Sequence, residues 1–206
     1  MEPSDPELAL AVAHEFPLLG VIEDNNFCVP SPTEITVNKK YHGLFLNQRY
    51  EVLDAKGNLL LQVDGSSLNL HKKRVMRDAA GSLILTMREK VKLLTLQHRW
   101  KVHRGRSSEE KDMIFVVQRS HPLEMNPRLD VFMMATNIRT FQLVGSYIDR
   151  SCKVYKGDII IAEVIDVYPR SNFSKWKESF RVKINAGVDY AFIVALLVIL
   201  TVNDYI

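Results

Sequence analysis

The sequence has 206 residues, 47% of them hydrophobic and 25% charged, with a formal net charge of +3 at pH 7. This composition indicates an ordinary globular protein that can bury a sizeable core. Only two cysteines occur, Cys28 and Cys152, and the acidic, proline-containing N-terminus does not resemble a secretory signal. A secreted disulfide scaffold is therefore excluded, and we expect an intracellular protein with free thiols.

The N-terminal segment, residues 1–28, contains few strand signals and is interrupted by Pro3, Pro6 and Pro17. We expect this segment to be loosely ordered. The remaining residues, 29–206, are expected to form a single domain.

A short pattern recurs along the chain and predicts β-hairpins. Asp54 and Asp78 are each followed three residues later by glycine, and apolar runs flank both pairs. Aspartate bonds to backbone amides and glycine tolerates positive φ, so both segments predict tight turns. The Lys-Gly-Asp sequence at 156–158 predicts a third turn of this kind.

Alternation of apolar and polar residues predicts the strands themselves. Leu83, Leu85 and Met87 would share one face, as would Phe180, Val182 and Ile184 on a later strand. Including the hairpins, roughly a dozen antiparallel strands are expected. Besides these, candidate strands lie at residues 35–37, 44–46, 91–96, 99–103, 113–119, 129–134, 141–147 and 159–167.

The C-terminal run VDYAFIVALLVIL, residues 188–200, predicts a helix that is apolar on every side. Its uncharged length would cover about 21 Å at a rise of about 1.5 Å per residue, too short for a bilayer core of roughly 30 Å. Asp189 and Asp204 bracket it. A buried helix is therefore favoured over the alternative, a tail anchor. The side chains assigned to its core are Tyr190, Phe192, Val194, Leu197 and Leu200.

These two predictions fit together in one architecture. A closed barrel of about twelve strands is too wide to be filled by its own side chains, whereas an apolar helix of about 10 Å diameter would fill it. We therefore predict a mainly β protein, a closed antiparallel β-barrel around a buried hydrophobic C-terminal helix. A small-molecule-binding barrel or an enzyme would instead require an open interior.

No motif in the sequence predicts catalysis. The six histidines lack metal-ligand spacing, and the chain has no GxSxG, GxxxxGK[ST], GxGxxG or CxxC pattern. We therefore expect a non-enzymatic protein without a metal or cofactor.

Basic charge is concentrated in residues 71–119, which carry thirteen Lys and Arg against five Asp and Glu. Such a surface suits an anionic lipid headgroup, an acidic protein or a nucleic acid, although a merely solvated strand face is an alternative. The densest cluster supplies the candidate ligands for an anionic headgroup, namely Lys72, Lys73, Arg74 and Arg77. Residues 104–112 read as an exposed, mobile polar loop.

Five stretches together resemble the plant LURP-one-related family: LHKKRVMRDAAGSLILTMREK, HRWKVHRG, RLDVFM, GSYIDRSCKVY and VDYAFIVALLVIL. The resemblance implies a barrel shared with the C-terminal domain of Tubby proteins and with phospholipid scramblases. It also implies a membrane-tethered, phosphoinositide-binding regulator or a transcription-related factor, with a role in plant defence. The expected protein is a cytoplasmic monomer, with peripheral association at the plasma membrane and a nuclear location as further possibilities. Protein partners are a second expectation, and lipid scrambling is not expected because no membrane-spanning segment is present.

Overall fold

The computed structural model describes residues 19–22, 26–42, 47–66, 72–92, 97–120, 128–146, 151–169 and 177–203. Within these residues the chain forms twelve strands, one turn of 3-10 helix, η1 (Glu110–Asp112), and one α-helix, α2 (Tyr190–Asn203). The strands are β1 (Thr33–His42), β2 (Asn47–Leu53), β3 (Leu59–Ser66), β4 (Lys73–Asp78), β5 (Leu83–Lys92), β6 (Gln97–Arg104), β7 (Met113–Arg119), β8 (Arg128–Met133), β9 (Ile138–Ser146), β10 (Ser151–Lys156), β11 (Ile159–Pro169) and β12 (Lys177–Ile184). The predicted strand at 44–46 lies outside the described residues.

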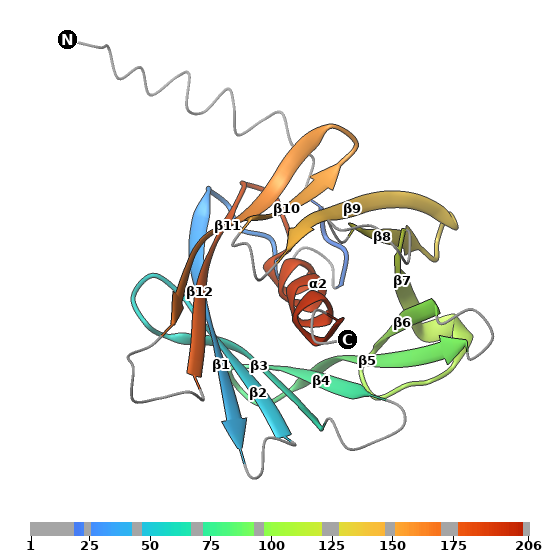
Figure 1. Cartoon of the computed structure of the whole chain (residues 1–206), viewed down its shortest axis with the longest axis horizontal. Coiled ribbons are helices and arrows are strands. Elements are labelled where there is room, and N and C mark those ends of the chain that lie inside the picture. Colours follow the sequence, from blue (N-terminus) through green and yellow to red (C-terminus); the bar gives the residue numbers. More distant parts are fainter. Residues whose placement is uncertain are drawn as a thin grey trace.

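The strands form one antiparallel sheet that closes on itself around α2 (Figure 1). Each strand pairs with its neighbours in sequence, and β1 also pairs with β12, from Thr33 opposite Ile184 to Lys40 opposite Lys177. Closure pairs what would otherwise be two exposed sheet edges. The predicted fold class is thereby confirmed.

The predicted turns connect β2 to β3 and β4 to β5. The N–H of Gly57 donates to the carbonyl of Asp54, and the N–H of Gly81 to that of Asp78, both at 3.0 Å. The two glycines have φ values of 87° and 88°, a conformation that residues with a Cβ rarely adopt. The sequence therefore fixes these hairpins locally.

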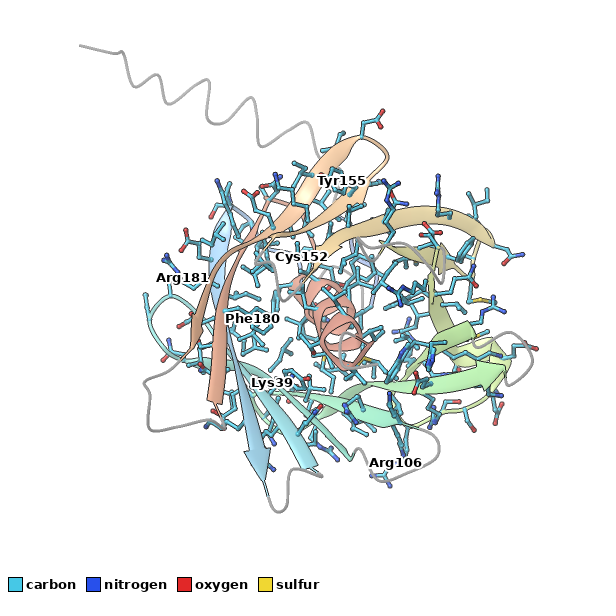
Figure 2. All side chains as sticks on the ribbon, viewed as in Figure 1. Lys39, Arg106, Cys152, Tyr155, Phe180 and Arg181 are labelled. Atoms are coloured by element: carbon cyan, nitrogen blue, oxygen red, sulfur yellow. The ribbon has the colours of Figure 1, made fainter. Side chains whose placement is uncertain are left out.

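Side chains alternate between the barrel interior and the outer wall. On β12, Phe180 is fully buried and faces α2, whereas Arg181 lies on the outside (Figure 2). On β6, Trp100 and Val102 are likewise buried. The interior also holds a cation, because Lys39 of β1 is fully buried. Most of the interior is nevertheless apolar, which leaves the outer wall to carry the majority of the charges.

Helix α2 fills the barrel, as predicted. Every side chain from Ala191 to Val202 is buried, and Tyr190 at its start is half-buried. The ring of Phe192 meets those of Phe115 and Phe141 at centroid distances of 5.2 and 4.8 Å. Four of the five side chains assigned to the helix core are at most 2% exposed: Phe192, Val194, Leu197 and Leu200. Among the described residues, no helix is both long and apolar enough to cross a bilayer.

Asp189 joins the start of α2 to the N-terminal part of the chain. One carboxylate oxygen accepts the N–H of Phe192 at 2.9 Å, which is an N-cap interaction. The other accepts the N–H groups of Val21 at 3.1 Å and Ile22 at 2.9 Å. Burial raises the pKa of Asp189, and these backbone hydrogen bonds oppose the shift. A carboxylate that looked like the boundary of an apolar run thus anchors the helix.

Most of the segment expected to be loosely ordered, residues 1–28, lies outside the described residues. In its described part, Ile22 is 1% exposed, Phe27 packs edge-on against Tyr190 with ring centroids 5.6 Å apart, and Cys28 forms a β-bridge with Asp189. This part covers the end of the barrel at which α2 begins.

We expect Val194→Asp to prevent folding, because the charge would lie among apolar side chains with no partner. Circular dichroism and thermal unfolding measure the outcome. Ile138→Asp is the matched control, since Ile138 is 64% exposed on β9 and the same charge there should change stability by less than about 0.5 kcal/mol. A cooperatively folded Val194→Asp protein would contradict burial of the helix.

Asp189→Ala should lower the free energy of unfolding by about 2 to 4 kcal/mol, because the cap and two backbone amides, one buried and one partly buried, lose their acceptor. Asp189→Asn retains an oxygen for Phe192 but presents an NH₂ donor to the N–H groups of Val21 and Ile22, so it should also destabilise the protein although the cap is kept. Urea denaturation compares the two variants. Unchanged stability of both variants would contradict the anchoring role of Asp189.

Candidate functional site

The four cations predicted to form a headgroup site are divided between the two faces of the barrel wall. Arg74 is fully buried inside, and Lys72 also turns inward, where its Nζ lies 3.6 Å from a carboxylate oxygen of Glu89. Lys73 is exposed on the outer wall, and Arg77 is half-buried, with its guanidinium donating to the carbonyl of Gly81 at 3.2 Å. The structure therefore does not bring these four side chains together.

The inward-facing cations hold a polar cluster at one end of the lumen. Arg74 donates to the side-chain oxygen of Gln48 at 3.0 Å, and burial is the main cause that lowers the pKa of its guanidinium. Glu89, 3% exposed, forms an ion pair with Lys72 and lies 2.6 Å from the Nδ1 atom of His98. These contacts cross from strand to strand inside the barrel. Lys72 and Arg74 therefore help to hold the barrel wall together.

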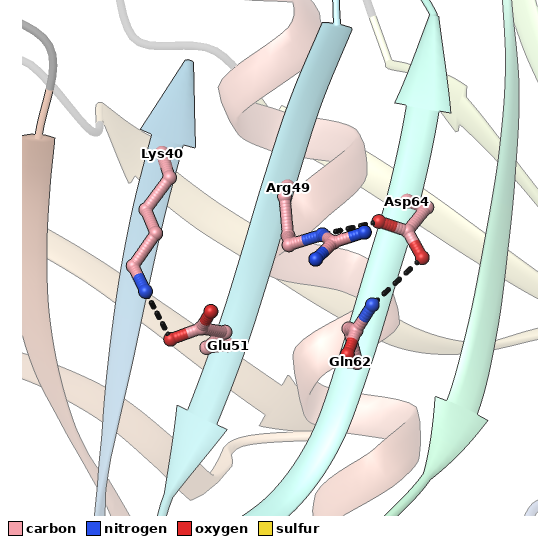
Figure 3. A network of polar contacts seen from close by, with 5 residues as sticks. All are labelled: Lys40, Arg49, Glu51, Gln62 and Asp64. Carbon is pink, nitrogen blue, oxygen red and sulfur yellow. Dashed lines mark hydrogen bonds and ion pairs between the residues drawn. The ribbon is translucent and has the colours of Figure 1, made fainter. Parts of the chain in front are cut away.

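On the outer wall, strands β1 to β3 neutralise their cations. Lys40 lies opposite Arg49 across the β1–β2 ladder, a like-charge pair that is unfavourable on its own. Each cation has a carboxylate partner, Glu51 for Lys40 and Asp64 for Arg49, and Gln62 also donates to Asp64 (Figure 3). The repulsion is compensated within the wall itself.

Strands β4 to β6 carry a second set of outward-facing like-charge pairs, here called the basic face: Lys73, Arg88, Lys90, Arg99 and Lys101. Arg88 lies opposite both Lys73 and Lys101, and Lys90 lies opposite Arg99. Among the described residues, no carboxylate forms an ion pair with any of the five. The uncompensated repulsion makes this part of the wall a candidate anion site.

The basic face is hollowed where the segment between β6 and η1 folds back over it. The resulting cavity, here called the β5–β6 groove, has a volume of about 290 Å³ and is lined by Arg88, Lys90, Lys101, His103, Ser108 and Glu110. Three cations and one carboxylate thus border one concavity.

The segment expected to be a mobile polar loop is held in place by hydrogen bonds. Arg88 donates to the carbonyl of Ser107 at 2.6 Å and to that of Arg106 at 3.1 Å. The hydroxyl of Ser107 donates to Asp112 at 2.6 Å, and the N–H of Gly105 donates to the carbonyl of Ile84 at 2.8 Å. One wall of the groove is therefore built by the loop.

His103 lies at the base of the groove. It is 4% exposed, and its Nδ1 atom has no hydrogen-bond partner among the described residues. Burial, followed by the nearby charges of Arg88 and Lys101, lowers the pKa of His103, while a hydrogen bond with the Lys101 backbone and the charge of Asp112 act in the opposite direction. The ring is consequently neutral near pH 7, and a bound anion would favour its protonation.

Sequence reasoning found the basic region but missed most of the groove. Of its predicted ligands, only Lys73 lies on the basic face, at the margin of the groove. Arg88 and Lys90 alternate with inward-facing Met87 and Glu89, a signal that could have marked them as outward. Their pairing with β6, and the folding of the loop over both strands, depend on cross-strand register.

The fold places this chain in the class of closed twelve-strand β-barrels that are filled by a C-terminal helix. A family profile described as LURP-one-related matches residues 33–201. The chain belongs to the LURP-one-related family.

Named relatives from Arabidopsis thaliana match over nearly their whole length. The chain is 42% identical to Protein LURP-one-related 14, covering 91% of this chain and 92% of the relative. It is 35% identical to Protein LURP1, and the match covers 87% of this chain and 88% of the relative. A crystal structure of an Arabidopsis thaliana protein is similar with a TM-score of 0.66 and 32% identity, covering 88% of this chain and 97% of the other. These names specify no enzymatic activity.

We expect Gly65→Ala to destabilise the protein by about 1 to 3 kcal/mol. A Cβ at Gly65 would lie 2.2 Å from the Arg74 side chain, which would have to leave its contact with Gln48. Chemical denaturation in a double-mutant cycle tests this explanation, since Gly65→Ala should cost little in an Arg74→Ala background. Additive losses would refute a steric conflict with Arg74.

Proposed function

We propose that this chain is a non-enzymatic regulatory protein that binds the headgroup of an anionic phospholipid, a phosphoinositide, in the β5–β6 groove. The supporting observation is that Arg88 and the opposing Lys101 line one concavity together with Lys90, and that among the described residues none of these three cations forms an ion pair with a carboxylate. A multiply charged phosphate ester would offset this repulsion and could accept hydrogen bonds from Arg88, Lys90 and Lys101.

The size and position of the groove favour a headgroup. Its volume of about 290 Å³ is close to the lower limit, about 300 Å³, of small-molecule pockets. The barrel interior is filled by α2, so acyl chains would stay in the bilayer while the outer wall holds the headgroup. The proposal therefore describes peripheral association, with cations supplying about 1 kcal/mol each near an anionic surface.

For the wider biological role, the support is the family resemblance alone. We include in the proposal a cytoplasmic location with peripheral association at the plasma membrane or entry into the nucleus, a relation to Tubby-like factors and scramblases, and a part in plant defence. An acidic protein or DNA is the alternative ligand for the same basic face.

The test is sedimentation of the full chain with phosphatidylcholine vesicles that contain phosphatidylinositol bisphosphate. Lys90→Glu with Lys101→Glu should weaken binding roughly 30-fold or more, because two favourable cations are lost. The matched control is Lys56→Glu with Lys183→Glu, which changes the net charge equally at two exposed sites outside the groove. The control should bind nearly as well as the unaltered chain.

Three results would argue against a lipid headgroup site. One is the absence of salt-sensitive sedimentation, and another is equal weakening by both double variants, which would indicate general charge attraction. The third is tighter, steeply salt-dependent binding to duplex DNA that only the groove variant loses, which would favour the DNA alternative.

A further inference from the structure

Two adjacent serines in the loop beside the groove have different surroundings. The Ser107 hydroxyl donates to Asp112 at 2.6 Å and accepts the N–H of Glu109 at 3.1 Å, and its side chain is half-buried. Ser108 is exposed, lines the β5–β6 groove, and makes no hydrogen bond to another described residue through its hydroxyl. Of these two serines, Ser108 is the one whose hydroxyl lies at a cationic cavity without a partner among the described residues.

We propose that Ser108 is a phosphorylation site and that its phosphate occupies the β5–β6 groove as an intramolecular ligand. The groove lining carries three cations, Arg88, Lys90 and Lys101, and one carboxylate, Glu110, for a formal charge of +2. A phosphoserine brings a charge of about −1.5 to −2 and three acceptor oxygens, which nearly balances that charge. Charge-assisted bonds to the cations would hold the modified loop on the wall.

The chemistry requires a protein kinase and ATP. The Ser108 oxygen attacks the terminal phosphorus of ATP, an O–P bond forms, and the bond between that phosphorus and the ADP oxygen breaks. The hydroxyl proton passes to the catalytic base of the kinase. Exposed Arg104 and Arg106 precede Ser108 and exposed Glu109 and Glu110 follow it, so charged side chains that a kinase could recognise flank an accessible hydroxyl.

Phosphorylation would regulate the site described above, a consequence that rests on the proposed headgroup binding. A phosphate already held by Arg88 and Lys101 leaves them unable to bind a second anion. Its charge would also be repelled by an anionic membrane. Modification of Ser108 would therefore release the protein from phosphoinositide vesicles.

Phosphorus NMR tests the intramolecular contact without any lipid. Phosphoserine is incorporated at position 108 of the full chain, and its second ionisation, normally near pH 6, is followed by titration. We expect the pKa of this phosphate to fall by about one unit, and Lys90→Glu with Lys101→Glu to restore it. Phosphoserine at position 107 is the matched control, because Asp112 beside it should raise the pKa instead.

Two results would overturn the intramolecular contact. One is an unshifted phosphate pKa at position 108, and the other is a lowered pKa that persists in the variant with Lys90→Glu and Lys101→Glu. Vesicle sedimentation separates the two proposals: if the unmodified chain does not bind, the headgroup function fails while the phosphorus shift still supports the contact. Mass spectrometry of the protein expressed in plant cells tests the modification. Phosphate on Ser108 supports it, and recovery of the loop peptide wholly unmodified there overturns it.

Discussion

Burial of α2 inside the barrel is the constraint on which the structure depends. The helix has 14 residues and is apolar on every side, so it has no face that could meet water. Each large apolar side chain that it buries contributes about 1.5 to 3 kcal/mol. Without it, a barrel of twelve strands would enclose an unfilled space. Because α2 fills the interior, the surfaces left for other molecules are the outer wall and its rims.

Much of this fold could be predicted because its signals are local. The Asp-to-Gly turns bond within a few residues, and the alternation on β5 and β12 gives their faces directly. The apolar C-terminal run predicts burial by its length and uniformity. A closed barrel could then be predicted because about twelve strands would enclose a lumen too wide for their own side chains, and the apolar helix would fill that lumen.

The site could be predicted only in part, because the sequence does not show which residues of β4 face the core and which face outward. Its two apolar residues, Val75 and Met76, are adjacent, so the sequence does not show which one faces the core. Met76 faces inward, and this parity places Arg74 inside and Lys73 outside. The juxtaposition of Arg88 and Lys101 depends on cross-strand register, which single-strand patterns do not contain.

Two like-charged cross-strand pairs on the outer wall differ in their carboxylate partners. Lys40 and Arg49 face each other and each forms an ion pair with a carboxylate, whereas Arg88 and Lys101 face each other and form no ion pair with a carboxylate of the described residues. Compensation in the first case favours stability of the sheet. Its absence in the second leaves electrostatic attraction available for an external anion or for a modified residue of the same chain.

The order of elements along the polypeptide has a consequence for biosynthesis. The strand that closes the ring, β12, and the helix that fills it are the last described elements to leave the ribosome, while β1 must wait for a partner about 150 residues downstream. In the nascent chain, the apolar inward faces of the earlier strands are therefore not yet covered by α2. Protection of those faces during translation, through delayed closure or chaperone binding, is a requirement set by the topology itself.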